Sequence, residues 1–357
     1  MDIQKDGTLT IHNKKNGKVL EKTHYFEIQE DEGDTYTVSP KGEICTTKGR
    51  NADIVYGDHQ ACVTHRLRLP WGSLEIATTV ELQEDHPELV LRTRIQNQCR
   101  NVRIRAVLEY PEGLDRAVSD TAYDLTERPV FDKGELNEKN IQTMPMRNLL
   151  YLPFRQGGEA VFSNSVQEYE CIRDGDRTIA SLTLLRAVGK VYALSTLTKD
   201  ETSVGDGVRW WSEQAQMQGA FCLEYALRSY SEEASPEQWM NEALSFAVPL
   251  KLYGIAAMGT APARRSLCEM QGAVLTSIES GEGRVCRIRG FNPAETSSSV
   301  VIRAGRPVFR AAKYSLSGEP LEELALESAD TVVFKARKHE IFTVQVVWGE
   351  DYENGLE

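Results

Sequence analysis

Histidines and carboxylates are the side chains of this sequence that could perform acid/base or metal chemistry. The six histidines lie at positions 12, 24, 59, 65, 86 and 339, and none has a spacing such as HxxxH that is typical of metal ligands. The sequence contains no GxSxG nucleophile motif, no P-loop and no dinucleotide-binding fingerprint. Carboxylates are plentiful, but no pair has a spacing that fixes the separation a glycosidase needs. The spacing of these side chains therefore identifies no catalytic residue and no metal site in this chain.

Arg186 is a charged residue in an unusual setting. It follows Ala180, Leu182 and Leu184 at a spacing of two, which places it on the same face of a strand as an apolar stripe. A charge there needs a partner, because burying an unpaired charge is costly. The partner is a ligand in one interpretation. In the plainer one, Arg186 lies past the end of its strand and reaches water or makes a structural ion pair.

Tyr36 comes directly after the acidic turn Asp31–Asp34, and turn residues there would present it on the following strand or at its edge. The plainer interpretation of the acidic turn is a solvated loop. Since Tyr36 follows a turn and Arg186 lies where its strand should end, we expect the two side chains to lie near each other on one exposed edge.

Alternating apolar residues predict the strands that must position these side chains. Two strands flank the turn Asp174–Asp176, and Asn16-Gly17 predicts another hairpin. Between positions 73 and 110 three strands follow one another, with apolar residues on one face and charges on the other. Keeping the apolar faces together pairs Ile95 with Ile104 and sets Arg94 across from Arg105, an unfavourable arrangement. We expect Glu75 and Glu81 on the preceding strand to neutralise these two arginines.

The last part of the chain contains one predicted helix and a set of short strands. Ser235 is the expected N-cap, with proline at the first helical position and Gln238 three residues after the cap. Residues 251–266 are the predicted linker. Short strands separated by turn signals then predict a small β-sandwich over residues 267–349, followed by a tail over 350–357.

Composition restricts the possible partners. The formal net charge of −12 argues against nucleic acid and anionic membrane surfaces as partners. The chain has no run of eighteen apolar residues and no signal-peptide core at its start. Its seven scattered cysteines include no CxxC pair, which favours a reducing compartment over a disulfide framework. We expect a cytoplasmic protein.

Five short motifs resemble the C-terminal β-region of glycoside hydrolase family 38, the α-mannosidases and mannosylglycerate hydrolases. The motifs, in the order of the family, are Asp31–Tyr36 with Ser39-Pro40, the run Glu88–Asn97, Glu168-Tyr169-Glu170 with the turn and Thr183–Gly189, Ala215-Gln216 with Gly219, and Arg289–Pro293. The resemblance implies a mostly-β fold: a large antiparallel supersandwich, galactose mutarotase-like, over residues 1–250, and then the small sandwich. The catalytic α/β barrel of the family, with its zinc site and aspartate nucleophile, is absent from this chain and would lie upstream of Met1.

The resemblance also implies a role for the two residues singled out above. Family members contribute a tyrosine and an arginine from this β-region to the rim of the substrate site, and Tyr36 and Arg186 match them by motif. Tyrosine offers a ring face and a hydroxyl to a sugar, and arginine a fork of donors. The implied partners are carbohydrate and the missing barrel, in cis or in trans, and the isolated chain is expected to be inactive.

Two other functions remain open from the sequence. One is a stand-alone carbohydrate-binding or scaffolding module without catalysis. The other is an aldose epimerase, which needs a histidine acid and a carboxylate base in one cleft, and for which His65 and Glu75 are the available pair.

Overall fold

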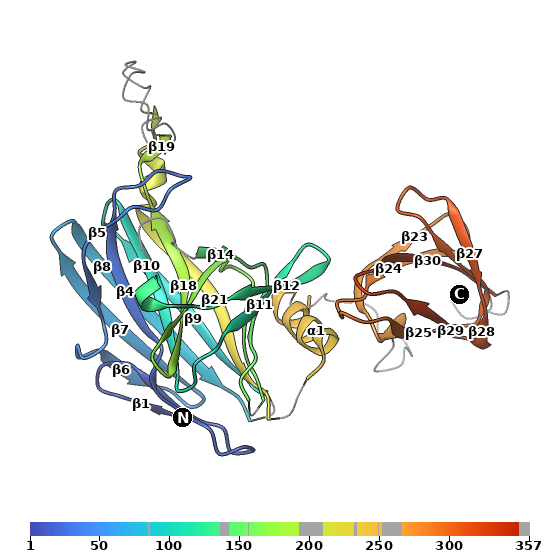
Figure 1. Ribbon diagram of the computed structural model, residues 1–357, viewed down its shortest axis with the longest axis horizontal. Coiled ribbons are helices and arrows are strands. Elements are labelled where there is room, and N and C mark those ends of the chain that lie inside the picture. The colour runs from blue at the N-terminus through green and yellow to red at the C-terminus, as the bar shows by residue number, and fades with distance from the viewer. Residues whose placement is uncertain are drawn as a thin grey trace, which may run out of the picture. The chain divides into compact units, whose positions relative to one another are not determined.

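The computed structural model describes residues 1–84, 86–135, 143–155, 157–192, 210–231, 234–248, 250–251 and 266–349. These residues form mostly antiparallel β-sheets in two compact units (Figure 1), which confirms the predicted mostly-β class. The large unit comprises residues 1–119 and 127–233, and the small unit comprises residues 120–126 and 234–357. Most of the predicted linker over 251–266 and the whole predicted tail over 350–357 lie outside the described residues.

The large unit is a sandwich of two sheets, and residues 120–126, which count with the small unit, belong to the end of the second sheet. In order across the first sheet, its described strands are β13 (Phe131–Asp132), β17 (Glu168–Asp174), β18 (Arg177–Ala187), β10 (Val102–Tyr110), β4 (Tyr25–Asp31) and β5 (Pro40–Thr46), with β14 (Thr143–Pro145) also pairing with β17. Those of the second sheet are β12 (Asp124–Pro129), β11 (Arg116–Thr121), β15 (Leu149–Leu152), β16 (Glu159–Ser163), β21 (Gly219–Ser229), β9 (Glu88–Asn97), β8 (Gly72–Leu82), β7 (Gln60–Leu69) and β6 (Asp53–Tyr56).

One apolar core lies between the two sheets, because the apolar residues that alternate along the strands of each sheet face the other sheet. Ile28 and Ile104 from the first sheet and Leu91 and Ile95 from the second are all fully buried in it. Short elements complete the large unit. They are β1 (Asp2–Ile3), β2 (Leu9–His12), β3 (Val19–Thr23), β19 (Lys190–Tyr192), β20 (Trp210–Trp211), and the 3-10 helices η1 (Lys133–Glu135) and η3 (Gln214–Gln216).

Both predicted hairpins are present. Gly175, between β17 and β18, has a φ of +63°, and Gly17, between β2 and β3, has a φ of +73°. Turns of this kind need positive φ, which glycine adopts without a steric cost.

The predicted hairpin of β9 and β10 is wrong. β9 pairs with β8 and β21 in the second sheet, whereas β10 pairs with β4 and β18 in the first. Residues 98–101 carry the chain from one sheet to the other, so Ile95 and Ile104 are buried in the same core but belong to different sheets. Arg94 and Arg105 are therefore on different sheets. The alternation predicted which side of each strand is buried, but it does not encode which strand lies alongside.

The charged outer faces exist, but with different partners from those predicted. Glu75 binds Arg66 and Glu81 binds Arg92, so neither glutamate neutralises Arg94 or Arg105. Arg105 instead lies between two glutamates of its own sheet, with Nη2 2.7 Å from Glu27 and Nη1 2.6 Å from Glu170.

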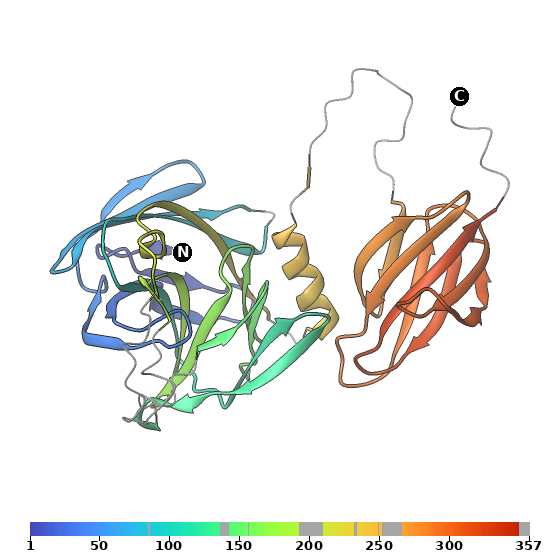
Figure 2. The ribbon, with the colours of Figure 1, turned by 90° about the horizontal axis from the view of Figure 1, so that it is seen from above.

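The small unit holds helix α1 (Pro236–Ala247) and a sandwich of two antiparallel sheets (Figure 2), which confirms the predicted small β-sandwich. Ser235 caps α1 as predicted, since its Oγ accepts a hydrogen bond from the backbone N–H of Gln238 at 3.1 Å. One sheet contains β22 (Cys268–Gln271), β25 (Ser298–Ala304), β29 (Thr331–Ala336) and β28 (Leu326–Ser328). The other contains β23 (Val274–Ser280), β24 (Val285–Phe291), β30 (Ile341–Trp348), β26 (Val308–Tyr314) and β27 (Pro320–Leu324).

Candidate functional site

A β-bulge in β18 decides where Arg186 points. Arg105 of β10 pairs with Thr183 and the next residue, Ile104, pairs with Leu185, so Leu184 is an extra residue in β18. Leu184 and Leu185 are both buried, and the strand beyond them is shifted by one residue. Arg186 consequently leaves the apolar face and lies on the outer face. The prediction that Arg186 continues the apolar stripe is wrong, because a count by twos cannot detect an inserted residue.

The loop of residues 31–39, which we call the Tyr36 loop, is folded around two buried carboxylates. Asp31 is fully buried, and its Oδ1 accepts the backbone N–H groups of Gly33 and Ser39, both at 2.9 Å. Asp34 is 2% exposed, and its Oδ1 accepts the N–H groups of Tyr36 at 2.9 Å and Thr37 at 2.8 Å. The plainer interpretation of the acidic turn as a solvated loop is therefore wrong for Asp31 and Asp34, whereas Glu32 is exposed.

Gly33 allows the Tyr36 loop to close on itself. A Cβ at this position would lie 1.9 Å from the carbonyl oxygen of Thr37 and 2.9 Å from Nη2 of Arg186. Any other residue would push these groups apart, so the tight turn requires glycine.

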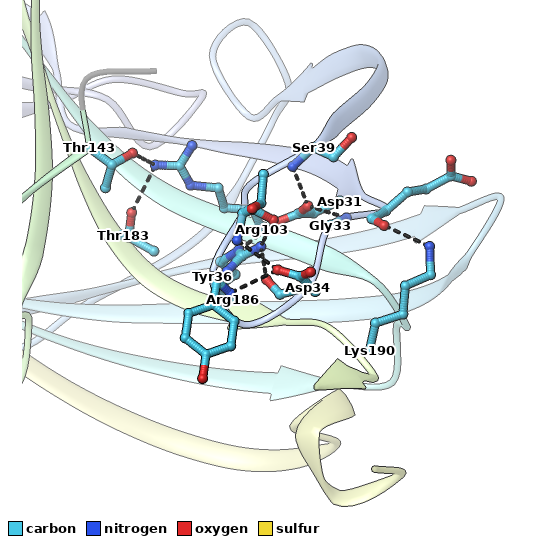
Figure 3. A network of polar contacts seen from close by, with 12 residues as sticks. Asp31, Gly33, Asp34, Tyr36, Ser39, Arg103, Thr143, Thr183, Arg186 and Lys190 are labelled. Atoms are coloured by element: carbon cyan, nitrogen blue, oxygen red, sulfur yellow. Dashed lines mark hydrogen bonds and ion pairs between the residues drawn. The ribbon is translucent and has the colours of Figure 1, made fainter. Parts of the chain in front are cut away.

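Arg186 reaches the Tyr36 loop from β18, which is separated from β4 by β10, and clamps it (Figure 3). Its Nε donates to Asp31 Oδ2 at 2.6 Å, and its Nη2 donates to the carbonyl oxygens of Asp34 at 2.7 Å and Thr37 at 2.8 Å. Arg186 thus neutralises a buried carboxylate and also satisfies loop carbonyls. These are the contacts of a residue that orders a loop.

A second arginine lies directly across from Arg186 on β10. Arg103 is 5% exposed, and its Nη2 donates to Thr143 at 2.9 Å and to Thr183 at 3.3 Å (Figure 3). Burial, and then the nearby charge of Arg105, lower the pKa of Arg103. The sequence pattern gave no indication of this residue, because it reads as one of several arginines on a solvated face.

Tyr36 is the residue that the ordered loop presents. Tyr36 is 77% exposed and lies beside Arg186 (Figure 3). The predicted proximity of Tyr36 and Arg186 is therefore confirmed. Lys190 adds a further tie to the loop, since its Nζ donates to the carbonyl oxygen of Glu32 at 2.8 Å. A rigid loop that holds an exposed aromatic ring suits contact with a flat apolar face of a ligand.

The pair considered for an epimerase does not share a cleft. His65 is 4% exposed on the core side of β7, whereas Glu75 of β8 binds Arg66 on the outer side of the same sheet. The two side chains are separated by the sheet, so they cannot act together as acid and base on one sugar.

No metal centre is visible in the described part of the chain, where no three side chains among His, Cys, Asp and Glu come close enough to hold an ion. None of the helices in the described residues is long and apolar enough to cross a membrane.

Comparison with known proteins identifies the family. Residues 1–190 match the family described as "Glycosyl hydrolases family 38 C-terminal domain". The chain belongs to glycoside hydrolase family 38. It is 22% identical over 383 residues to a protein of Halalkalibacterium halodurans named "Putative mannosylglycerate hydrolase", and this match covers 94% of the chain and 40% of that relative.

Solved structures share the fold. An α-mannosidase from Enterococcus faecalis V583 has a TM-score of 0.79 at 20% identity, over 96% of this chain and 41% of its own. A family 38 protein from Enterococcus faecalis has a TM-score of 0.78 at 20% identity, over 96% of this chain and 42% of its own. The chain thus spans about two fifths of the length of these relatives and corresponds to their C-terminal region.

Proposed function

We propose that this chain completes the substrate cleft of a family 38 glycoside hydrolase acting on α-mannosidic linkages, with Tyr36 in contact with the sugar. The observation that carries the proposal is the Tyr36 loop, where two buried carboxylates and Arg186 fix the backbone around an exposed tyrosine. Because these bonds fix the backbone that carries the tyrosine, less conformational entropy remains to be lost in the loop when a ligand binds.

Arg186 acts on the substrate through the loop in this proposal. Its Nε and Nη2 already bond to Asp31, Asp34 and Thr37. The arginine therefore sets the position of Tyr36. The proposal also includes a direct contact from the third donor nitrogen of Arg186, Nη1, to a sugar hydroxyl or a catalytic carboxylate.

The chemistry of bond cleavage belongs to the partner barrel in this proposal. The zinc ion and the nucleophile would be held by that barrel, joined in cis or supplied in trans. The seven cysteines are free in the structure, which supports action in a reducing compartment, and we propose the cytoplasm.

The test is made in an enzyme that joins this chain to its catalytic barrel. Tyr36→Ala should lower kcat/KM for an aryl α-mannoside about tenfold or more, and Tyr36→Phe, which removes a single hydroxyl, by about two- to tenfold. Tyr56→Ala is the matched control, because Tyr56 is 68% exposed on strand β6 of the second sheet. Unchanged kinetics in both Tyr36 variants would contradict the proposal.

The rival function, a stand-alone carbohydrate-binding module, makes a different prediction for the same residue. The isolated chain would then bind mannose oligosaccharides in the absence of any barrel, and Tyr36→Ala would abolish that binding. In the cleft-completing function the isolated chain supplies part of a site, and we expect no saturable binding at millimolar sugar.

A further inference from the structure

We propose that Gln216 is a positioning residue for the Tyr36 loop, acting through Asn101 and Asp31. The inference rests on the proposed function, since Tyr36 is the residue that it positions. Gln216 lies in the short helix η3, far from Tyr36 in sequence, and no contact between the two is needed for the effect.

The side-chain amide of Gln216 is paired with one residue at both ends. Its Oε1 accepts the backbone N–H of Asn101 at 2.7 Å, and its Nε2 donates to Asn101 Oδ1 at 2.7 Å. Gln216 is fully buried, so neither bond is exchanged with water at low cost. Asn101 has a φ of +48°, a left-handed conformation that asparagine tolerates better than most residues. The two bonds from Gln216 hold Asn101 in that conformation.

A backbone hydrogen bond links Asn101 to the start of the Tyr36 loop. Its carbonyl oxygen accepts the N–H of Asp31 at 2.8 Å, at the point where the loop leaves strand β4. Asp31 is the residue whose carboxylate holds Gly33, Ser39 and Arg186. A rotation of the Asn101 peptide would therefore shift the residue on which the loop is built.

Gln216 itself has no freedom to follow such a shift. Asn97 donates from Nδ2 to the carbonyl oxygens of Gln216 at 3.3 Å and Met217 at 2.9 Å. On another side, a Cβ at Gly189 would lie 2.5 Å from Gln216 Nε2, so the backbone there approaches the amide closely. Gln216 thus fixes the crossover of residues 98–101 between the two sheets, and through Asn101 it also fixes the Tyr36 loop.

The experiment measures amide hydrogen exchange in the chain itself. Gln216→Met keeps the length of the side chain and removes both hydrogen bonds. We expect the amides of Gly33, Tyr36 and Ser39 to exchange about tenfold faster or more, while those of the small sandwich are unchanged. Gln214→Met is the matched control, because Gln214 lies exposed in the same 3-10 helix. Unaltered exchange in the loop of a folded Gln216→Met variant would overturn the inference.

A second variant covers the case in which Gln216→Met does not fold. Glycine at position 101 tolerates the positive φ. Asn101→Gly removes the side-chain acceptor of the Gln216 Nε2–H bond and keeps the backbone N–H that Gln216 Oε1 accepts. We expect the same loop amides to exchange faster, by a smaller factor than in Gln216→Met. Unchanged exchange in this variant, with Gln216→Met unfolded, would overturn the inference.

Kinetics in the enzyme that carries the barrel separate positioning from general stability. If Gln216 acts through Tyr36, Gln216→Met lowers kcat/KM in the presence of Tyr36 and has little further effect in a Tyr36→Ala background. An equal loss in both backgrounds would overturn the inference. Faster loop exchange together with normal kinetics of Tyr36→Ala would instead overturn the proposed function alone and would still support the control of the loop by Gln216.

Discussion

Burial changes the pKa of single polar residues in the large unit, and His24 is an example. His24 is 3% exposed, and its Nε2 lies 2.7 Å from the hydroxyl of Tyr225; the same hydroxyl lies 3.2 Å from Oγ1 of Thr93. Desolvation, followed by the nearby His65, lowers the pKa of His24 from an ordinary 6.5 to about 4. The imidazole is therefore neutral in the folded protein at pH 7.

We predict that the large unit loses stability as the pH falls from about 6.5 to about 4. In that window the unfolded chain protonates His24 and the folded chain does not, so acid favours unfolding. The full loss is about 3 kcal/mol, of which about 2 kcal/mol is reached by pH 5. Urea unfolding at pH 7 and pH 5 measures it.

His24→Asn provides the comparison for the acid effect, since asparagine also tolerates the φ of +59° at this position. The variant should be less stable at pH 7 but lose about 2 kcal/mol less than the parent between pH 7 and pH 5. An equal loss in both proteins would show that another group, such as His65, is responsible.

At the scale of strands, the two charged outer faces differ in how far they exclude water. Arg105 has a side chain that is 11% exposed between Glu27 and Glu170, which are 20% and 11% exposed. Arg92 has a side chain that is 50% exposed between Glu81 and Glu224. The same arrangement of one arginine and two carboxylates therefore lies in two different environments.

We predict that removing the arginine has unequal effects on the two faces. Arg105→Met leaves two shielded carboxylates beside each other, which should cost at least about 2 kcal/mol of unfolding free energy. Arg92→Met leaves solvated carboxylates and should cost about 1 kcal/mol or less. Denaturant unfolding of both variants gives the comparison, and equal losses would contradict the assignment of burial.

The strands and their buried sides could be predicted from the sequence, whereas strand neighbours and irregularities could not. Alternation identified the buried faces around Ile95 and Ile104, because burial on one side of a strand is a local property. It misplaced their pairing, which depends on contacts far along the chain. It also misplaced Arg186, because the extra residue at Leu184 has no sequence signal of its own.

The candidate site was partly predictable for the same reason. Tyr36 and Arg186 were found by motif, and their proximity followed from two local clues. An acidic turn by itself favours solvated carboxylates, whereas Asp31 and Asp34 are buried and the Asp31 carboxylate pairs with Arg186, which lies far along the chain. Gln216 belonged to a quoted motif, but its pairing with Asn101 requires the fold.

For the whole molecule, the chain corresponds to the C-terminal region of longer family 38 relatives. We predict that the purified chain does not hydrolyse an aryl α-mannoside, because it matches the C-terminal domain of the family and spans about two fifths of the length of its relatives. The measurement compares turnover with that of an intact family member, and metal analysis after dialysis serves as the control. Turnover comparable with the intact enzyme, or one zinc ion per chain, would contradict the prediction.

The position of β21 has a consequence for how the protein is made and how it can be cut. β21 pairs with β16 on one side and with β9 on the other, and Ile95 of β9 lies opposite Phe221. During synthesis β9 and β16 therefore keep unpaired edges until residues 219–229 have been made. Unpaired strand edges are prone to pair with other chains. A fragment ending at residue 190, where the family match ends, would lose β21 and leave the second sheet in two unconnected pieces.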